Sequence, residues 1–225
     1  MSDLAIQVEQ LGKSFNSIVA VHDLTFQVQR GEIFGMLGPN GAGKTTTIRM
    51  LMDILKPDTG TVSILGQPPS AVRERVGYLP EERGLYRTLR LTETLVYLGQ
   101  LKGMTRAAAQ KRSAELLARV ELSEWSKRKV QELSRGMHQK LQIAASIIHD
   151  PDLVILDEPF QGLDPVNVEL VKNLIRELRA QGKTIALSAH EMSQVEALCE
   201  RILLIDYGSA VLYGDLSEIK TRFAP

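Results

Sequence analysis

The sequence predicts an α/β fold, with an antiparallel β-subdomain near the N-terminus and an α-helical subdomain inserted into the core. Continuous apolar runs at 32–37 and 153–156 are typical of buried parallel strands. Side chains at 4–10 and 24–29 alternate between apolar and polar, which is typical of half-buried antiparallel strands. From 92 to 120 the pattern is helical, so we expect this segment to interrupt the series of strands.

The loop after the first apolar run matches the spacing of a phosphate-binding loop. Residues 38–45 read Gly-Pro-Asn-Gly-Ala-Gly-Lys-Thr and fit G-x-x-x-x-G-K-[ST] at every fixed position. The glycines allow backbone N–H groups to turn inward as a concave anion site. Lys44 can reach the β- and γ-phosphates of a nucleotide, and the Thr45 hydroxyl can take one position on a magnesium ion. We therefore predict a P-loop NTPase core.

A helix is expected directly after this loop. Four apolar residues are spaced i, i+3, i+4 and i+7 and share one face, namely Ile48, Leu51, Met52 and Leu55. Residues 56–58, Lys-Pro-Asp, then end the helix. Its N-terminus points toward the loop, where N–H groups and the helix dipole favour a bound phosphate. The alternative, a glycine-rich turn that happens to contain a lysine, lacks this strand and helix context.

The segment between the two N-terminal strands, residues 12–17, is predicted as a loop that carries an aromatic ring. Phe15 in this loop could stack on a nucleobase or fold onto the core. Two further short strands are predicted at 61–64 and 76–79, and residues 80–84 break the pattern after them.

The helical insertion ends in a second capped helix. Ser134, in the run Leu-Ser-Arg-Gly-Met at 133–137, is a good N-cap for a helix that Asp150 and Pro151 terminate. Its predicted apolar face comprises Met137, Leu141, Ala144 and Ile148. We expect one domain over 1–225, with a core at 1–84 and 150–225 and a helical subdomain at 85–149.

Two adjacent acids follow the apolar run at 153–156. Asp157 and Glu158 would stand at the carboxyl end of a buried central strand, where two carboxylates are costly without a cation or a proton. In a P-loop NTPase, Mg²⁺ supplies the cation and an attacking water gives the second acid a task. The alternative is a strand end that simply reaches solvent.

The C-terminal third continues the alternation of helix and strand. Asp164 and Pro165 fit the N-cap and N1 positions of a helix that ends near Gly182. The next strand, 184–188, places His190 at the carboxyl edge of the sheet, where ligands of open α/β folds bind. A closing hairpin is expected at 201–213, and the other histidines, His22, His138 and His149, are interpreted as structural.

The overall charge gives no sign of a nucleic-acid partner. Lysine plus arginine equals aspartate plus glutamate, 27 against 27, so no overall field favours nucleic acid, and none is expected as a partner. The single cysteine, Cys199, allows no intrachain disulfide and is expected to be a small buried apolar residue in a reducing compartment. No apolar run approaches the roughly 18 residues of a spanning helix, so a soluble protein is expected.

With these motifs in this order, nearly the whole sequence resembles the ATPase subunit of an ATP-binding cassette (ABC) transporter. The resemblance implies a RecA-like P-loop core and assigns the Walker A motif to 38–45, the Walker B motif to 153–158 and the D-loop to 162–164. It also assigns the switch histidine to His190 and an adenine-stacking ring to Phe15. The implied ATP-binding residues are Phe15, Gly38, Pro39, Asn40, Gly41, Ala42, Gly43, Lys44, Thr45 and Thr46.

Two motifs depart from the family pattern. The Q-loop at 79–81 has Glu81 in place of glutamine, and the signature at 133–137 reads L-S-R-G-M instead of L-S-G-G-Q. With the run Gly-Tyr-Leu-Pro-Glu-Glu-Arg-Gly-Leu-Tyr at 77–86, they resemble a subgroup that includes bacterial sodium exporters and other drug or ion efflux pumps.

The resemblance implies a mechanism with a head-to-tail dimer, either a homodimer or a heterodimer. Glu158, His190 and Lys44 would act in ATP hydrolysis, and Thr45, Glu81 and Asp157 would hold Mg²⁺. The residues that would act across the dimer are Ser134, Arg135, Gly136, Met137 and Asp164. The ATPase would drive a separate membrane permease and lie in the cytoplasm, peripheral to the inner face of the cell membrane.

Other classes remain open from the sequence. A soluble ABC ATPase of DNA repair or translation shares the motifs, but repair members carry long coiled-coil insertions and translation members usually carry two cassettes. A GTPase would need an N-K-x-D run, which the sequence lacks. A nucleotide-regulated module that does not hydrolyse ATP is disfavoured by the acid at Glu158.

Overall fold

The structure, a computed structural model, describes residues 3–82 and 84–223, so Arg83 of the run at 77–86 lies outside the described residues. Its larger sheet has the strand order β5-β6-β7-β3-β8-β9. The first five strands are parallel, and β9 pairs antiparallel with β8. The strands are β3 (Ile33–Leu37), β5 (Val76–Leu79), β6 (Leu153–Leu156), β7 (Thr184–Ala189), β8 (Arg201–Asp206) and β9 (Ser209–Asp215). The predicted parallel core and closing hairpin are therefore present.

The smaller sheet is the predicted antiparallel subdomain, in the order β2-β1-β4. Its strands are β1 (Leu4–Phe15), β2 (Ile18–Gln29) and β4 (Thr59–Ile64). The prediction of a loop at 12–17 is wrong for residues 12–15, which continue β1 and pair with β2 as far as Phe15 opposite Ile18. Register shifts interrupt this ladder, so the side chains lose the strict alternation by which a strand is recognised.

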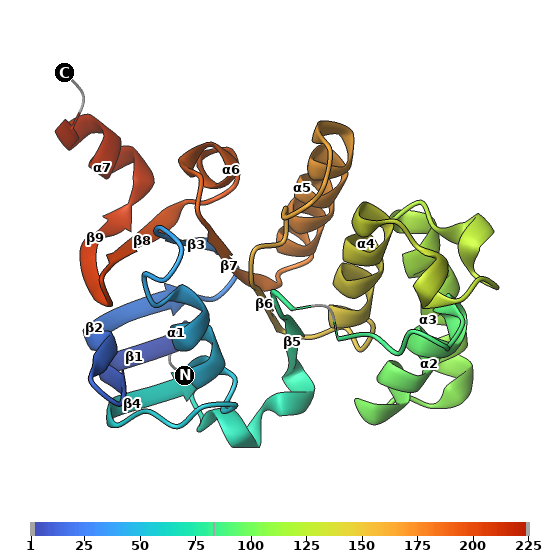
Figure 1. Cartoon of the computed structure of the whole chain (residues 1–225), viewed down its shortest axis with the longest axis horizontal. Helices are drawn as coiled ribbons and strands as arrows, with labels where there is room; N and C mark the ends of the chain where they lie inside the picture. The colour runs from blue at the N-terminus through green and yellow to red at the C-terminus, as the bar shows by residue number, and fades with distance from the viewer. Residues whose placement is uncertain (1–2, 83, 224–225) are drawn as a thin grey trace.

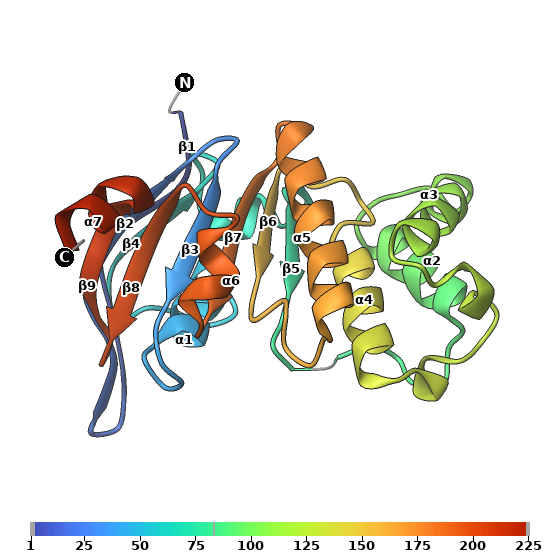
Figure 2. The same cartoon turned by 90° about the horizontal axis from the view of Figure 1, so that it is seen from above.

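Within the described residues there are seven helices, of which the last follows the final strand: α1 (Lys44–Leu51), α2 (Leu91–Leu101), α3 (Arg106–Arg119), α4 (Arg135–Ser146), α5 (Pro165–Ala180), α6 (Met192–Glu196) and α7 (Leu216–Phe223). Short 3₁₀ turns lie at η1 (Pro69–Ala71), η2 (Arg73–Arg75), η3 (Ser123–Trp125) and η4 (Val130–Glu132). The sequence reasoning did not predict α6 and α7. Helices α2 and α3 lie at one end of the molecule, opposite β9 and α7 (Figures 1 and 2).

Two helices end earlier than their apolar patterns predict. Helix α1 ends at Leu51 because Asp53 takes a left-handed conformation (φ 56°), and the N–H groups of Ile54 and Leu55 both donate to the carbonyl of Arg49. Helix α4 ends at Ser146, and Asp150 is left-handed (φ 54°). In both cases the last residues of the predicted face still pack inward from a turn, so the apolar pattern runs past the helix.

The larger sheet separates two apolar cores. Ile33 and Leu37 of β3 point into a cluster shared with α4 and α5, whereas Phe34 and Met36 point into a cluster shared with α1 and the smaller sheet. This alternation along one strand buries both faces of the sheet, which explains the continuous apolar run of β3. Within the described ranges no helix has the length and apolarity needed to cross a bilayer.

The core between the two sheets generates a prediction about stability. Phe34 is fully buried, stacks on Phe26 at 5.7 Å between ring centroids and meets the edge of Tyr213. We expect Phe34→Ala to lower the free energy of unfolding by about 3–5 kcal/mol, because it removes buried apolar area and leaves a cavity. Tyr207→Ala is the control, since Tyr207 is 89% exposed and its loss should change stability by less than about 0.5 kcal/mol. Denaturant unfolding compares the two, and equal losses would contradict the prediction.

Candidate active site

The P-loop joins the end of β3 to the start of α1 and is backed closely by other backbone. Gly38 (φ 154°) and Gly43 (φ 108°) adopt conformations that favour glycine. A Cβ atom on Gly43 would lie 2.5 Å from the carbonyl oxygen of Ala20, and one on Gly38 would lie 2.2 Å from that of Ile205. Glycine is therefore required at both positions for two reasons. The backbone conformation favours it, and a side chain would collide with a carbonyl oxygen.

The turn of the C-terminal hairpin holds the P-loop in place. The N–H of Gly208 donates to the carbonyl of Ala42 at 2.9 Å, and the N–H of His22 on β2 donates to the carbonyl of Gly208 at 2.8 Å.

The P-loop borders a hollow of about 180 Å³. Its described lining residues are Ala20, Asn40, Gly41, Ala42, Gly43, Lys44, Thr45, Thr46, Glu81 and Glu158.

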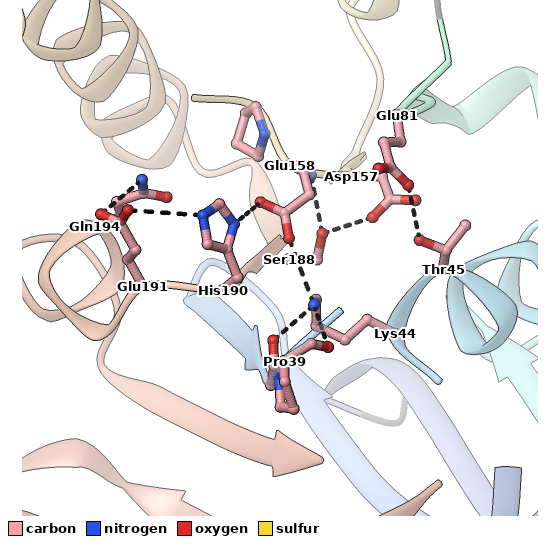
Figure 3. A network of polar contacts seen from close by, with 12 residues as sticks. Pro39, Lys44, Thr45, Glu81, Asp157, Glu158, Ser188, His190, Glu191 and Gln194 are labelled. Atoms are coloured by element: carbon pink, nitrogen blue, oxygen red, sulfur yellow. Dashed lines mark hydrogen bonds and ion pairs between the residues drawn. The ribbon is translucent and has the colours of Figure 1, made fainter. Parts of the chain in front are cut away.

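Lys44 lies in this hollow with its ammonium group folded over the loop (Figure 3). Its Nζ donates to the carbonyls of Gly38 at 2.7 Å and Pro39 at 3.1 Å, and it lies 3.5 Å from Oε1 of Glu158. Both side chains of this ion pair are more than nine-tenths buried. The structure therefore brings together the predicted phosphate-binding lysine and Glu158, the second acid of the predicted acidic pair.

Ser188, which the sequence reasoning missed, organises the acidic pair. Its hydroxyl donates to Oδ1 of Asp157 at 2.6 Å and accepts from the backbone N–H of Glu158 at 2.9 Å (Figure 3). Ser188 is fully buried near the end of β7, the strand beside β6. A hydroxyl near the carboxyl end of a strand that is apolar from 185 to 187 was the signal that could have identified it.

The second carboxylate oxygen of Glu158 contacts His190, the predicted switch histidine. Its Oε2 lies 2.9 Å from Nδ1 of His190, and Nε2 of His190 lies 3.6 Å from a carboxylate oxygen of Glu191. The backbone of Glu158 is left-handed (φ 50°), an uncommon conformation for a residue other than glycine and one often found at functional sites. The contacts with Glu191 were not foreseen from the sequence.

Asp157, Thr45 and Glu81 converge with oxygen donors only. Burial raises the pKa of the Asp157 carboxyl above its usual range, and the neighbouring charges of Glu81 and Glu158 add to this effect. Oδ2 of Asp157 is buried and accepts no hydrogen bond from the described residues, while the Thr45 hydroxyl lies 3.4 Å from a carboxylate oxygen of Glu81. An unpartnered carboxylate oxygen beside a hydroxyl and a second carboxylate fits Mg²⁺.

This donor set is incomplete on its own. Among the described residues, no group of three or more His, Cys, Asp or Glu side chains is arranged to hold a metal ion. Mg²⁺ in nucleotide sites usually takes one or two carboxylates and completes its shell with water and substrate phosphates. The residues present fit an ion that arrives with a nucleotide.

The remaining predicted site residues lie outside the hollow. Phe15 is 45% exposed at the end of the β1–β2 hairpin, with the Lys13 ammonium 5.7 Å from its ring centroid. The hairpin projects on the side where β3 and β8 end (Figure 2). Phe15 is not among the described residues that line the hollow, so the structure does not bring its ring to the P-loop.

The signature and the D-loop lie against each other within the chain. Ser134 caps α4 by accepting from the N–H of Met137 at 3.3 Å, as predicted, and Arg135 beside it is exposed. A Cβ atom on Gly136 would lie 3.5 Å from Leu163, next to Asp164. Asp164 is the N-cap of α5, and a hydrogen bond from the backbone of Asn167 lowers the pKa of its carboxyl.

Two glutamines of α4, also missed from the sequence, tie this helix to the acidic loops. Nε2 of Gln139 donates to the carbonyl of Pro159 at 3.1 Å, and Nε2 of Gln142 donates to the carbonyl of Glu82 at 3.3 Å.

A ring nitrogen of His149, which follows this helix, lies 3.2 Å from the carbonyl oxygen of Val76, and burial lowers the pKa of His149 to about 4. It is therefore neutral near pH 7, which agrees with a structural role.

Fold and site together define a P-loop ATPase, and the comparisons name its family. The profile described as "ABC transporter" matches residues 21–161. The chain belongs to the ABC transporter family. It is an ATP-binding subunit of such a transporter, and it hydrolyses ATP.

Three similar proteins illustrate this membership. The uncharacterized ABC transporter ATP-binding protein MJ1023 of Methanocaldococcus jannaschii is 45% identical over 97% of this chain and 80% of its own. The Nod factor export ATP-binding protein I of Paraburkholderia xenovorans is 39% identical over 95% and 72%. A solved structure titled as the ATP binding subunit of an ABC transporter superposes with a TM-score of 0.90, at 32% identity over 97% and 93% of the two chains.

The carboxylate of Glu81 generates a prediction about metal dependence. An ionised oxygen is a stronger Mg²⁺ ligand than an amide oxygen, but it repels the phosphates when no cation lies between them. Glu81→Gln should therefore narrow the ratio between ATP affinity with Mg²⁺ and ATP affinity with EDTA. Titration of a fluorescent ATP analogue measures both affinities, with Glu82→Gln, an exposed neighbour, as the control. An unchanged ratio would mean that Glu81 does not contact the metal.

Proposed function

We propose that this chain pairs head to tail with a second ATPase domain and drives a separate membrane permease, most simply as the motor of an exporter. The observation that carries the proposal is the convergence of Lys44, Glu158 and His190 at the P-loop, in contact with one another. This is the set of groups that phosphoryl transfer to water requires: a cation for the phosphates, a base for the water and an orienting partner for the base.

Glu158 is proposed as the general base that orients and deprotonates the attacking water. Its two oxygens face different groups, because Oε1 lies toward Lys44 and Oε2 toward His190. When the γ-phosphate draws Lys44 away, Oε1 becomes free to accept the proton of a water. His190, anchored to the other oxygen, is then positioned to contact the γ-phosphate.

Binding of the triphosphate is assigned to the P-loop. The inward N–H groups and Lys44 would cradle the β- and γ-phosphates. Thr45, Asp157 and Glu81 would hold Mg²⁺, which when bound neutralises charge on the phosphate oxygens. Phe15 is proposed to stack on the adenine from the hairpin that projects on the same side.

The exposed N-terminus of α4 supports dimerisation. Ser134 and Arg135 lie at the surface with Asp164 nearby, and none of them lines the hollow of their own chain. In a two-fold head-to-tail dimer these residues, with Gly136 and Met137, would face the γ-phosphate held by the partner's P-loop. The site would thus be complete only when two ATPase domains meet on ATP.

A groove at the junction of the helical insertion and the core supports the proposal that the chain binds a permease. It has a volume of about 340 Å³ and is lined by apolar residues of the insertion, among them Leu85, Leu98 and Leu101. Its core wall includes Tyr78 and Pro80, next to Glu81. A protein that fills this groove would therefore touch the segment that carries a proposed metal ligand. Through such a permease the chain would sit in the cytoplasm at the inner face of the membrane.

Export is the direction that the comparisons favour, because a curated relative carries that word in its name. The second candidate, a soluble ABC ATPase of DNA repair or translation, has no specific observation in its favour in the structure. The helical insertion lacks a long coiled coil among its described residues, with α2 and α3 at 11 and 14 residues.

The assignment of Glu158 as general base predicts a trapped dimer. Glu158→Gln should bind ATP but hydrolyse it at least about a hundredfold more slowly, the low end for a lost general base. It should also dimerise with Mg-ATP, since the composite site persists when ATP is not consumed. Light scattering and phosphate release measure the two effects, with Glu115→Gln, at an exposed position of α3, as the control. A variant that stays monomeric while turning over normally would exclude this role.

The groove predicts a membrane protein as the neighbour. Cysteines placed at Glu82 and Tyr86, both exposed near the groove, should crosslink to an integral membrane protein when membranes are labelled. Cys199 is buried and burial raises its thiol pKa, so the wild-type chain serves as the unlabelled control. Glu169→Cys places a cysteine at an exposed position of α5 that does not line the groove, and it should not crosslink to the same membrane protein. Labelling confined to non-membrane proteins would favour the repair or translation function instead.

A further inference from the structure

Two segments of the helical insertion form a short antiparallel ribbon with a high density of positive charge. Residues 87–92 pair with residues 126–131 through backbone hydrogen bonds, among them Leu91 N–H to the carbonyl of Arg128 and Val130 N–H to that of Leu89, both at 3.0 Å. The two segments, here called the basic ribbon, contain no acid, and all of their cations are exposed. These cations are Arg87, Arg90, Lys127, Arg128 and Lys129.

Two of the cations face each other across the basic ribbon. Arg90 and Lys129 form its antiparallel bridge. The backbone hydrogen bonds run between the residues on either side of them, so this is a non-hydrogen-bonded pair, the kind whose side chains lie closest. Like charges directly opposite each other are destabilising. The basic ribbon therefore contains a repulsion that a bound anion would relieve.

The neighbouring acids compensate only part of this charge. Glu93 accepts a hydrogen bond from the backbone N–H of Arg90 at 2.9 Å, and Glu132 accepts one from that of Lys129 at 2.8 Å. Their ion pairs, with Arg90 at 3.7 Å and with Arg128 at 3.3 Å, join side chains that are all more than a third exposed, so these pairs contribute little. Three cations of the basic ribbon form no ion pair within the described part of the chain, namely Arg87, Lys127 and Lys129.

The surface beside the basic ribbon is aromatic and apolar. Tyr86, which directly precedes it, is half exposed and meets Tyr97 of α2 edge to face at 5.3 Å. Leu101, the last residue of α2, is also exposed and lines the groove. Tyrosine rings and aliphatic side chains next to lysine and arginine are typical of a surface that meets the headgroup region of a membrane. The exposed leucine favours a bilayer over a nucleic acid, which offers no hydrocarbon layer to an aliphatic side chain.

We propose that the basic ribbon binds the phosphate groups of anionic phospholipids in the bilayer that holds the permease. The inference rests on the proposed function, which brings the neighbouring groove against a membrane protein. Guanidinium and ammonium groups form charge-assisted hydrogen bonds with phosphate oxygens. Each lysine or arginine near an anionic membrane surface strengthens binding by about fivefold. The insertion would thus contact the lipid surface directly, in addition to the permease.

Vesicle sedimentation tests the proposal with the full chain, in the absence of permease and nucleotide. The two kinds of vesicle contain phosphatidylcholine alone, or phosphatidylcholine and phosphatidylglycerol in equal parts. The chain should bind the anionic vesicles at least about a hundredfold more tightly, the combined effect of the three cations that form no ion pair. Added salt should weaken this binding, because it screens exposed charges.

Substitutions in the basic ribbon should remove the preference for anionic vesicles. The triple variant Arg87→Gln, Lys127→Gln, Lys129→Gln should lose most of it, and Lys129→Gln alone should lose about fivefold. Thermal unfolding of both variants shows whether they remain folded. Lys129→Gln should not lower the unfolding temperature, because it removes the repulsion with Arg90.

A matched control separates the basic ribbon from total charge. It loses the same charge at three exposed positions outside the ribbon and should keep the preference of the wild-type chain. Its substitutions are Arg30→Gln, Arg106→Gln and Lys111→Gln. Soluble glycerol phosphate is a control for the source of the phosphate. At equal phosphate concentration it should not displace the chain from anionic vesicles, because a single phosphate cannot meet all the cations at once.

Several results would overturn the proposal. They are equal binding to the two kinds of vesicle, no binding to either, and a triple variant that binds as the wild-type chain does. Displacement by glycerol phosphate would instead assign the basic ribbon to a single small phosphate. An RNA oligonucleotide that binds more tightly than the anionic vesicles at equal phosphate concentration would assign it to nucleic acid.

The test of lipid binding is independent of the tests of the proposed function. The vesicles contain no permease and no ATP, so failure to bind them leaves the proposed ATPase motor standing. Failure of the crosslinks from the groove, in turn, would remove the permease but leave the measured affinity for anionic vesicles unchanged.

Discussion

The burial of two adjacent carboxylates at the end of β6 is the constraint on which the rest of the site depends. Asp157 is fully buried and Glu158 nearly so, and ionised groups in such a position need donors or cations close by. The sheet supplies them from neighbouring strands: Ser188 comes from β7, His190 follows it, and Lys44 follows β3. Because the carboxyl ends of parallel strands meet at one edge, a single sheet can place all of these groups together.

The helix α4 connects this site to two other surfaces. Its capped N-terminus is exposed, its middle contacts the loops that carry Glu158 and Glu82 through Gln139 and Gln142, and its last turn lines the groove. A rigid helix that touches all three regions offers a physical route by which a change at the nucleotide could reach a docked partner. The hydrogen bonds end on backbone carbonyls, so they respond to the position of the loops rather than to their side chains.

The smaller sheet has a role in the site as well as in the core. The carbonyl oxygen of Ala20 on β2 would lie 2.5 Å from a Cβ atom on Gly43 and 2.8 Å from one on Gly208, so neither position has room for a side chain. The N–H of His22 on the same strand donates to the carbonyl of Gly208. The P-loop is thus confined between its own helix and two hairpins. This confinement orients the loop before a nucleotide binds, which reduces the ordering that binding requires.

The sequence by itself determined the local elements of this protein. The P-loop, the apolar strand before Asp157 and the caps Ser134 and Asp164 depend on the chemistry of a few consecutive residues, and the structure contains each of these local features. The errors were also local: bulges hid the end of β1, and left-handed residues ended α1 and α4 early. Only the tertiary structure decided which of these elements meet. Ser188 and Gln139 act through partners that lie 31 and 20 residues away in the chain, because strand order and helix packing are set by burial of the whole core rather than by neighbours in sequence.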